Sequence, residues 1–203
     1  MLGRMRILGL ILGLFFAACA QESVENELDF REFSQDEKIT LQSVNGGEKT
    51  LIRTEKGFIV EGEEGKILMF DFFGTFCQPC KDEAFELTKL WQNNAQNFTI
   101  IGLDHFEEVS DEVVVKFAKD HNAFYFLSNS KENGRIIAQI LRDIAYPSME
   151  QLPFKVVLKN GTYQNLSDFW NKNQRVKFYL GKVPTALIQK DLDAIMEVED
   201  AQK

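Results

Sequence analysis

Apolar and polar residues follow one another along the chain in short segments whose spacing separates strands from helices. The nearly continuous apolar segment Ile67 to Phe73 predicts a central strand buried on both faces, although Asp71 interrupts it. Other segments typical of strands are Ile39 to Ser43, Glu48 to Arg53, Phe58 to Val60, Phe98 to Leu103, Phe124 to Leu127, Phe154 to Leu158 and Val176 to Leu180. Apolar residues at helical spacing predict helices after Cys80, from Ser110 to about Asp120, from Asn133 to Ala145 and from Pro184 to about Glu197.

The order of these elements predicts an α/β fold. Asn45-Gly46 is a turn signal that joins the first two strands into an N-terminal β-hairpin. Later strands alternate with helices, which is typical of a mostly parallel sheet. The length of 203 residues suits one domain with a substantial core.

The start of the chain has the pattern of an export signal. Two arginines precede the apolar segment Ile7 to Phe16, which at ten residues is too short to span a bilayer. The following Ala17-Ala18-Cys19 resembles, together with Phe16, the lipobox of bacterial lipoproteins, in which the cysteine is lipidated and becomes the new N-terminus. Phe16 departs from the usual leucine, and a plain secretory signal or an uncleaved anchor are the alternatives.

Three segments follow from this interpretation: a lipoprotein signal peptide at 1–18, a flexible lipid-anchored tether at 19–37 and a folded domain at 38–203. The net charge of −8 falls to about −10 when the signal and its two arginines are removed. This charge disfavours a nucleic-acid partner, because such a surface needs clustered positive charge. Attachment to the membrane is therefore expected through acyl chains and not through charge.

Cysteine usage places the chemistry at Cys77-Gln78-Pro79-Cys80. Two cysteines three apart at the start of a helix can form a reversible disulfide, and the helix end stabilises a thiolate on the first. We expect Cys77 to be the exposed nucleophile and Cys80 the buried resolving thiol. Half of a zinc site and an inert structural disulfide are the alternatives, but a second cysteine or histidine pair for zinc is missing. No metal or other cofactor is expected.

The stretch from Asp71 to Glu83, DFFGTFCQPCKDE, resembles the active-site stretch of the thioredoxin superfamily. Gly74-Thr75 before the motif and Glu83 after it resemble the TlpA/ResA-like membrane-anchored thiol–disulfide oxidoreductases. The family's two tryptophans before the first cysteine are Phe73 and Phe76 here. The resemblance covers roughly residues 39–196 and implies a thioredoxin-like fold with a central mixed sheet flanked by helices.

This resemblance also implies a cis-proline that faces the disulfide, and two prolines compete for that position. Val183-Pro184-Thr185 resembles the family signature, but only nineteen residues follow Pro184, too few for two strands and a helix. Pro153 is followed by the expected strand, turn, return strand and helix, so it is the predicted cis-proline. The backbone of Leu152 would then lie beside Cys77 and pair with an extended substrate. Residues Asn165 to Arg175 become an insertion in the C-terminal hairpin.

Two carboxylates match acids that the family uses near its thiols. Asp71 lies six residues before Cys77, and burial should raise its pKa so that it accepts the Cys80 proton. The lysine that neighbours this acid in thioredoxins falls at Gly102, so a cationic partner is expected to be missing. Glu83 matches a glutamate that tunes the thiols. The alternatives are a solvated strand-end residue for Asp71 and a first-turn helix carboxylate for Glu83.

The predicted function is reduction of disulfides in exported proteins, for instance apocytochrome c or a copper-site thiol pair. The resemblance implies re-reduction by a membrane electron donor. A disulfide-forming oxidase or isomerase is one alternative, because the sequence does not give a reduction potential. A lipoprotein that binds a partner and carries only a structural disulfide is the other.

Overall fold

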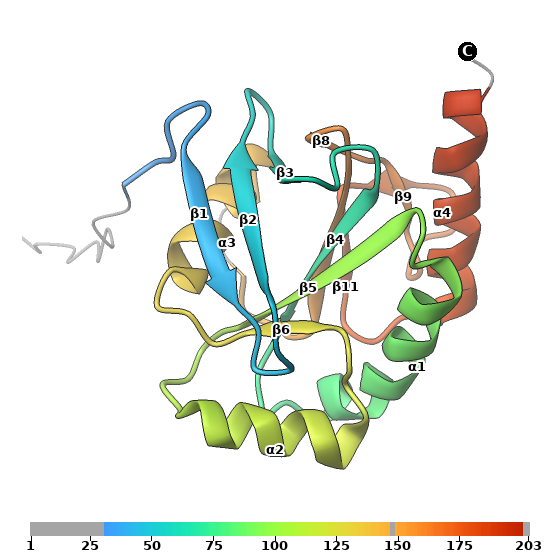
Figure 1. The fold of residues 1–203 in the computed structure, drawn as a ribbon. Helices are drawn as coiled ribbons and strands as arrows, with labels where there is room; N and C mark the ends of the chain where they lie inside the picture. Colours follow the sequence, from blue (N-terminus) through green and yellow to red (C-terminus); the bar gives the residue numbers. More distant parts are fainter. Residues whose placement is uncertain (1–30, 147–148, 201–203) are drawn as a thin grey trace, which may run out of the picture.

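A six-stranded mixed sheet forms the centre of the fold in the computed structural model, which describes residues 31–146 and 149–200 (Figure 1). Its strands run in the order β11 (Phe178–Leu180), β7 (Phe154–Lys159), β4 (Ile67–Phe73), β5 (Phe98–Asp104) and β6 (Phe126–Ser128), with β8 (Thr162–Tyr163) beside β7. Strand β4 is parallel to β5 and antiparallel to β7. All residues of β4 are buried, which confirms the predicted central strand.

A second sheet is built from the N-terminal strands β1 (Lys38–Gln42), β2 (Glu48–Arg53) and β3 (Phe58–Val60), all antiparallel. The predicted hairpin is therefore present, and the predicted strand Phe58–Val60 joins it as a third strand. The Asn45 side chain donates to the carbonyls of Ala123 and Tyr125, at 2.8 and 2.7 Å. These bonds tie the hairpin turn to the segment that leads into β6.

Helices cover both faces of the central sheet, as the predicted fold class requires. The helices α1 (Gln78–Asn94), α2 (Asp111–His121) and α4 (Thr185–Asp200) lie on one face, and α3 (Asn133–Asp143) and the second sheet lie on the other (Figure 1). Alternate residues of β4 serve the two sides, since Met69 and Phe73 pack with the first group and Phe70 and Phe72 with the second. Because successive side chains of β4 point to opposite faces of the sheet, this one strand contributes to both hydrophobic cores.

The C-terminal hairpin of β7 and β11 carries the predicted insertion. Within it, β9 (Leu166–Ser167) and β10 (Arg175–Val176) form a small antiparallel sheet. Asp191 of α4 anchors this segment, because its carboxylate accepts bonds from the Ser167 N–H and hydroxyl, each at 2.7 Å. The Tyr179 hydroxyl donates to the same carboxylate at 2.7 Å. Buried Asp191 therefore fixes the insertion against the last helix.

The part of the predicted tether that the structure describes, residues 31–37, packs on the domain. Phe33 is buried, and its ring lies 5.2 Å from that of Phe58. The Phe33 N–H donates to the Gln139 side chain at 2.9 Å, and Glu37 forms an ion pair with Arg135 at 2.8 Å. The folded domain thus starts upstream of the predicted boundary at 37/38, because α3 supplies partners that a polar local sequence does not reveal.

The helix boundaries differ from prediction by a few residues. Helix α3 ends at Asp143 and not at Ala145, which adopts a left-handed φ of 54°. Helix α4 begins at Thr185, so Pro184 precedes the helix, and its carbonyl accepts the Leu187 N–H at 2.9 Å. Strand β6 begins at Phe126 and not at the predicted Phe124, whose N–H donates to the Thr88 hydroxyl of α1 at 2.9 Å.

Candidate active site

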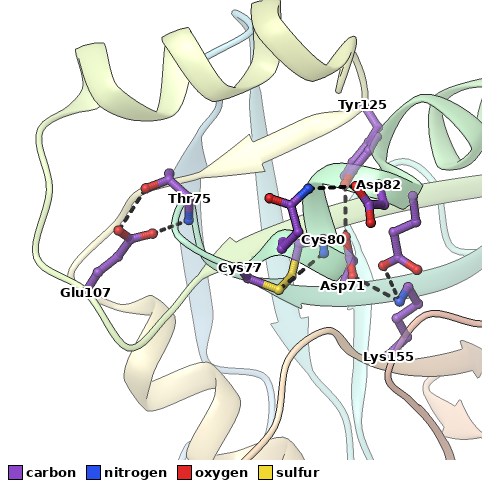
Figure 2. The surroundings of a disulfide bond; sticks show 10 residues. Asp71, Thr75, Cys77, Cys80, Asp82, Glu107, Tyr125 and Lys155 are labelled. Atoms are coloured by element: carbon purple, nitrogen blue, oxygen red, sulfur yellow. Dashed lines mark hydrogen bonds and ion pairs between the residues drawn. A yellow bond between two sulfur atoms is a disulfide. The ribbon is translucent and has the colours of Figure 1, made fainter.

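Cys77 and Cys80 form a disulfide at the start of α1 (Figure 2). Cys77 is the N-cap of the helix, and its sulfur accepts the Cys80 N–H at 3.2 Å. Pro79 occupies the first turn, where its missing N–H costs no helix hydrogen bond. The N–H groups in the first turn of a helix have no hydrogen-bond partner within the helix. Together with the positive end of the helix dipole, they stabilise a negative charge on the Cys77 sulfur.

Both sulfurs are covered in this oxidised state. Cys77 is 6% exposed and Cys80 is 3% exposed. The expectation of an exposed Cys77 is therefore wrong for the disulfide form, although Cys77 is the less covered of the two. The neighbouring Phe76 is 57% exposed instead, and its ring folds back over Gly74. A side chain at Gly74 would meet that ring, since a Cβ built there lies 2.6 Å from it.

The Leu152–Pro153 peptide bond is cis, as the chain-order argument predicted, and among the described residues it is the one cis bond. The Pro153 carbonyl accepts the Gly181 N–H at 2.8 Å, which closes the loop onto the end of β11. Leu152 packs against the core cluster that contains both cysteines. Pro153 is buried directly before β7.

A fully buried lysine joins the two predicted carboxylates behind the disulfide. Lys155 of β7 lies directly opposite Asp71 of β4 in the sheet register. Its Nζ is 2.5 Å from Glu83 Oε1. It is 3.6 Å from Asp71 Oδ1, and this pair is labelled in Figure 2. The Tyr125 hydroxyl donates to the other Asp71 oxygen at 2.9 Å. The site thus contains a cluster of two acids, one cation and one phenol, which we name the buried charge cluster.

Burial dominates the ionisation of this cluster. It raises the pKa of Asp71 above the ordinary value, while the Lys155 ammonium and the Tyr125 hydroxyl act in the opposite direction. Burial likewise raises the pKa of Glu83 to about 7, again opposed by Lys155. One lysine charge is shared between two buried carboxylates, so it does not hold both of them at their usual acidity.

The structure corrects one expectation about these acids, and it excludes the alternatives considered for Asp71 and Glu83. The cationic partner of Asp71 is not missing, because Lys155 supplies it from the opposite neighbouring strand. Asp71 is buried within β4 and is not a solvated strand end. Glu83 lies beyond the first turn of α1 and is buried against Lys155, so it is not a first-turn surface carboxylate. One feature of the sequence could have revealed this buried cation: Lys155 follows the predicted cis-proline by two residues and lies within an apolar strand.

Solved structures give the fold independently. A crystal structure of a thiol:disulfide interchange protein of the thioredoxin family from Chlorobium tepidum TLS is 15% identical, with a TM-score of 0.54 over 81% of this chain and 96% of that one. The chain has a thioredoxin-like fold. StoA from Bacillus subtilis is 13% identical, with a TM-score of 0.50 over 77% and 96% of the two chains. A DsbF homologue from Corynebacterium diphtheriae is 16% identical, with a TM-score of 0.50 over 79% and 86%. No protein-family model and no curated protein sequence matches the chain.

The site has a second acidic group that the sequence analysis missed. Glu107, which follows β5, accepts the Thr75 hydroxyl at 2.8 Å and also the Thr75 N–H (Figure 2). Asp104, the last residue of β5, is buried. Burial and the adjacent Glu107 carboxylate raise the pKa of Asp104 to about 8. The run Asp-His-Phe-Glu-Glu at the end of a predicted strand was the signal that could have revealed this group.

Replacing Asp104 with asparagine is expected to change how stability depends on pH. The folded pKa of about 8 exceeds the ordinary value of 3.8, so the folded state retains a proton that the unfolded chain has lost. Wild-type stability should fall between about pH 4 and pH 8 through this group, by at most about 1.4 kcal/mol per pH unit. The variant lacks this contribution, so it should gain stability relative to wild type from pH 5 to pH 8 in urea unfolding. Glu112→Gln, which removes an exposed carboxylate, is the control. If the stability of both variants changes with pH in the same way, the raised pKa assigned to Asp104 is contradicted.

The other sequence-based predictions concern the N-terminal segment, the membrane and metal binding. The signal peptide at 1–18 and Cys19 fall in the part that the structure does not describe. Among the described helices, none is both long enough and apolar enough to cross a membrane. No group of three or more His, Cys, Asp or Glu side chains in residues 31–146 and 149–200 is arranged to hold a metal ion.

Proposed function

We propose that the protein is a thiol–disulfide oxidoreductase that acts on exported proteins through Cys77 and Cys80. The observation that carries this proposal is the disulfide at the start of α1, with Cys77 at the N-cap and the Cys80 N–H directed at its sulfur. Backbone N–H groups and the helix dipole favour a thiolate at that position. The thioredoxin-like fold and the cis bond before Pro153 support the same reading.

The proposed direction is reduction of the substrate. The Cys77 thiolate attacks one sulfur of a substrate disulfide, and the other substrate sulfur leaves as a thiolate. Cys80 then loses its proton and attacks Cys77 in the mixed disulfide, which releases the second substrate sulfur. Two electrons pass from the protein to the substrate, and the Cys77–Cys80 disulfide is formed. A membrane electron donor is proposed to return the protein to the dithiol.

The buried charge cluster is proposed to receive the Cys80 proton. Glu83 follows Cys80 by three residues on α1, so the two side chains are neighbours on one helix face. The raised pKa values of Glu83 and Asp71 bring these acids closer to the pKa of a thiol, which favours proton transfer. Lys155 acts in this proposal as a positioning residue, because its charge sets which carboxylate holds the proton.

Leu152 and Pro153 are proposed to align the substrate. Pro153 lacks an N–H, and its carbonyl is already bound to the Gly181 N–H. The backbone groups proposed for an extended substrate chain are therefore those of Leu152, in a short β-like contact. Leu152 packs against both core clusters, one of which contains the two cysteines.

The proposed location is extracytoplasmic, in a bacterial cell envelope, where Cys19 carries the lipid anchor to the membrane after removal of residues 1–18. This proposal rests on the apolar segment of the signal and on the small residues before Cys19. Suitable substrates would be oxidised exported proteins such as apocytochrome c or a copper-site thiol pair. Their identity follows from the resemblance to TlpA/ResA-like proteins and is part of the proposal.

Equilibration with glutathione tests the redox function directly. The Cys77–Cys80 pair should titrate between disulfide and dithiol, with a reduction potential below about −220 mV for the proposed reductase. A potential near or above about −150 mV would favour the oxidase or isomerase. If the pair stays oxidised at every glutathione ratio, the disulfide is structural and the partner-binding lipoprotein is favoured.

Trapping identifies the substrate and controls this measurement. Cys80→Ser should accumulate mixed disulfides with extracytoplasmic proteins, since Cys77 attacks but nothing resolves the adduct. Cys77→Ser is the matched control and should trap far less. Mass spectrometry of the adducts then names the substrate, and the absence of any adduct would contradict the enzymatic role.

A further inference from the structure

An acidic cavity lies beside Glu107, whose carboxylate binds Thr75 in the loop before Cys77. It has a volume of about 700 Å³ and is lined by the segment after β5 and by the loop between β6 and α3. Its lining includes four carboxylates, those of Asp104, Glu107, Glu108 and Asp111. Lys131 lines it as well and adds one positive charge.

Of the four carboxylates that line the cavity, the Asp104 carboxylate is the one whose surroundings indicate a ligand. Asp104 is only 6% exposed, and neither of its carboxylate oxygens has a hydrogen-bond partner. An ionised buried carboxylate without a donor is costly, so Asp104 either keeps a proton beside Glu107 or pairs with a cation or donor from outside the chain. The backbone of Asp104 is held in place, since the Asn133 side chain donates a hydrogen bond to the Asp104 carbonyl at 3.1 Å.

The cavity is coupled to the reactive site through Thr75. Glu107 lines the cavity and also accepts the Thr75 hydroxyl at 2.8 Å. Thr75 precedes Cys77 by two residues, a separation that spans at most about 7 Å. Whatever occupies the cavity therefore lies close to a substrate disulfide that reacts with Cys77.

The chemistry of the cavity favours an organic cation. The described residues hold no cluster suited to a metal ion, and four carboxylates repel an anion. The exposed ring of Phe106 also lines the cavity, with its centroid 4.2 Å from that of His105. An aromatic face beside carboxylates suits a side chain that has an apolar stem and a charged head.

We propose that this acidic cavity binds a lysine or arginine side chain of the substrate, close to the substrate disulfide. The inference rests on the proposed oxidoreductase function and specifies its substrate class. The raised pKa of Asp104 agrees with it, because the Asp104–Glu107 pair holds a proton when no cation is present. A bound basic group would supply the missing charge and release that proton.

Two cyclic peptides test the inference. Each contains one disulfide, and they differ only by arginine or glutamine beside one cysteine. The full-length chain, reduced beforehand, transfers two electrons to each peptide, and the second-order rate constants are compared. We expect wild type to prefer the arginine peptide by about tenfold, mainly through KM. In Asp104→Asn and in Glu108→Gln on the exposed loop, the preference should fall to about twofold or less.

The control variant is Glu112→Gln, which removes one exposed charge next to the cavity without lining it. It should retain the tenfold preference, and this separates the cavity from net charge. Equal rates for both peptides in wild type would overturn the inference and leave the oxidoreductase function intact. An unchanged preference in both cavity variants would overturn it as well. If neither peptide is reduced, the proposed function itself fails.

Discussion

Replacing Lys155 with methionine should lower the free energy of unfolding by about 3–5 kcal/mol at pH 8, because removal of one partner leaves buried charges uncompensated. Lys155 is fully buried, and its ammonium is 2.5 Å from Glu83 and 3.6 Å from Asp71. Without it, both carboxylates face an apolar core with only the Tyr125 hydroxyl as donor. Urea unfolding at several pH values measures the loss.

The pH dependence identifies the cause of that loss. Folded pKa values above the ordinary ones mean that stability falls as pH rises toward the folded pKa. Removal of Lys155 raises the pKa values of Asp71 and Glu83 further, so at pH 5 both acids should be neutral and the loss smaller. An equal loss at pH 5 and pH 8 would indicate packing and not charge.

Two further variants serve as controls for Lys155. Lys38→Met breaks an exposed ion pair with Glu61 and should cost no more than about 1 kcal/mol. Lys155→Met combined with Asp71→Asn and Glu83→Gln removes the charges together and should recover part of the lost stability. Failure of the triple variant to recover would contradict the electrostatic explanation.

Replacing Cys77 with serine should reduce the rate of disulfide exchange by at least about 10³-fold. A thiolate is the nucleophile in this chemistry, and a serine hydroxyl at the same helix end does not ionise near neutral pH. The measurement is the initial rate of reduction of a peptide that contains one disulfide, with dithiol-reduced protein. Cys80→Ser should still form the first mixed disulfide quickly and then stop.

Stability measurements separate chemistry from folding in this pair of variants. Cys77→Ser and Cys80→Ser lose the same disulfide, so their free energies of unfolding should be similar. A shared folding defect would slow both variants equally. Equal rates of mixed-disulfide formation in the two variants would contradict the assignment of Cys77 as the attacking thiol.

Much of the site could be predicted because its determinants are local or depend on chain order. The disulfide follows from two cysteines at the start of a helix, and the structure contains it. The choice of Pro153 over Pro184 depended on counting the elements that must follow a cis-proline, and the cis bond is at Leu152–Pro153. The role of each residue in catalysis stays a prediction.

What the sequence by itself determined is the set of helices and longer strands, because a period of two or 3.6 and the turn and capping residues act over a few positions. The two-residue strands β8, β9 and β10 were not predicted. Only the tertiary structure decided which charges meet. Lys155 reaches Asp71 through the antiparallel register of β4 and β7, and Glu107 reaches Thr75 across the ends of neighbouring segments. Phe33 likewise finds its partners on a distant helix and strand. Such contacts join residues far apart in the chain, and their energies depend on burial that no local pattern specifies.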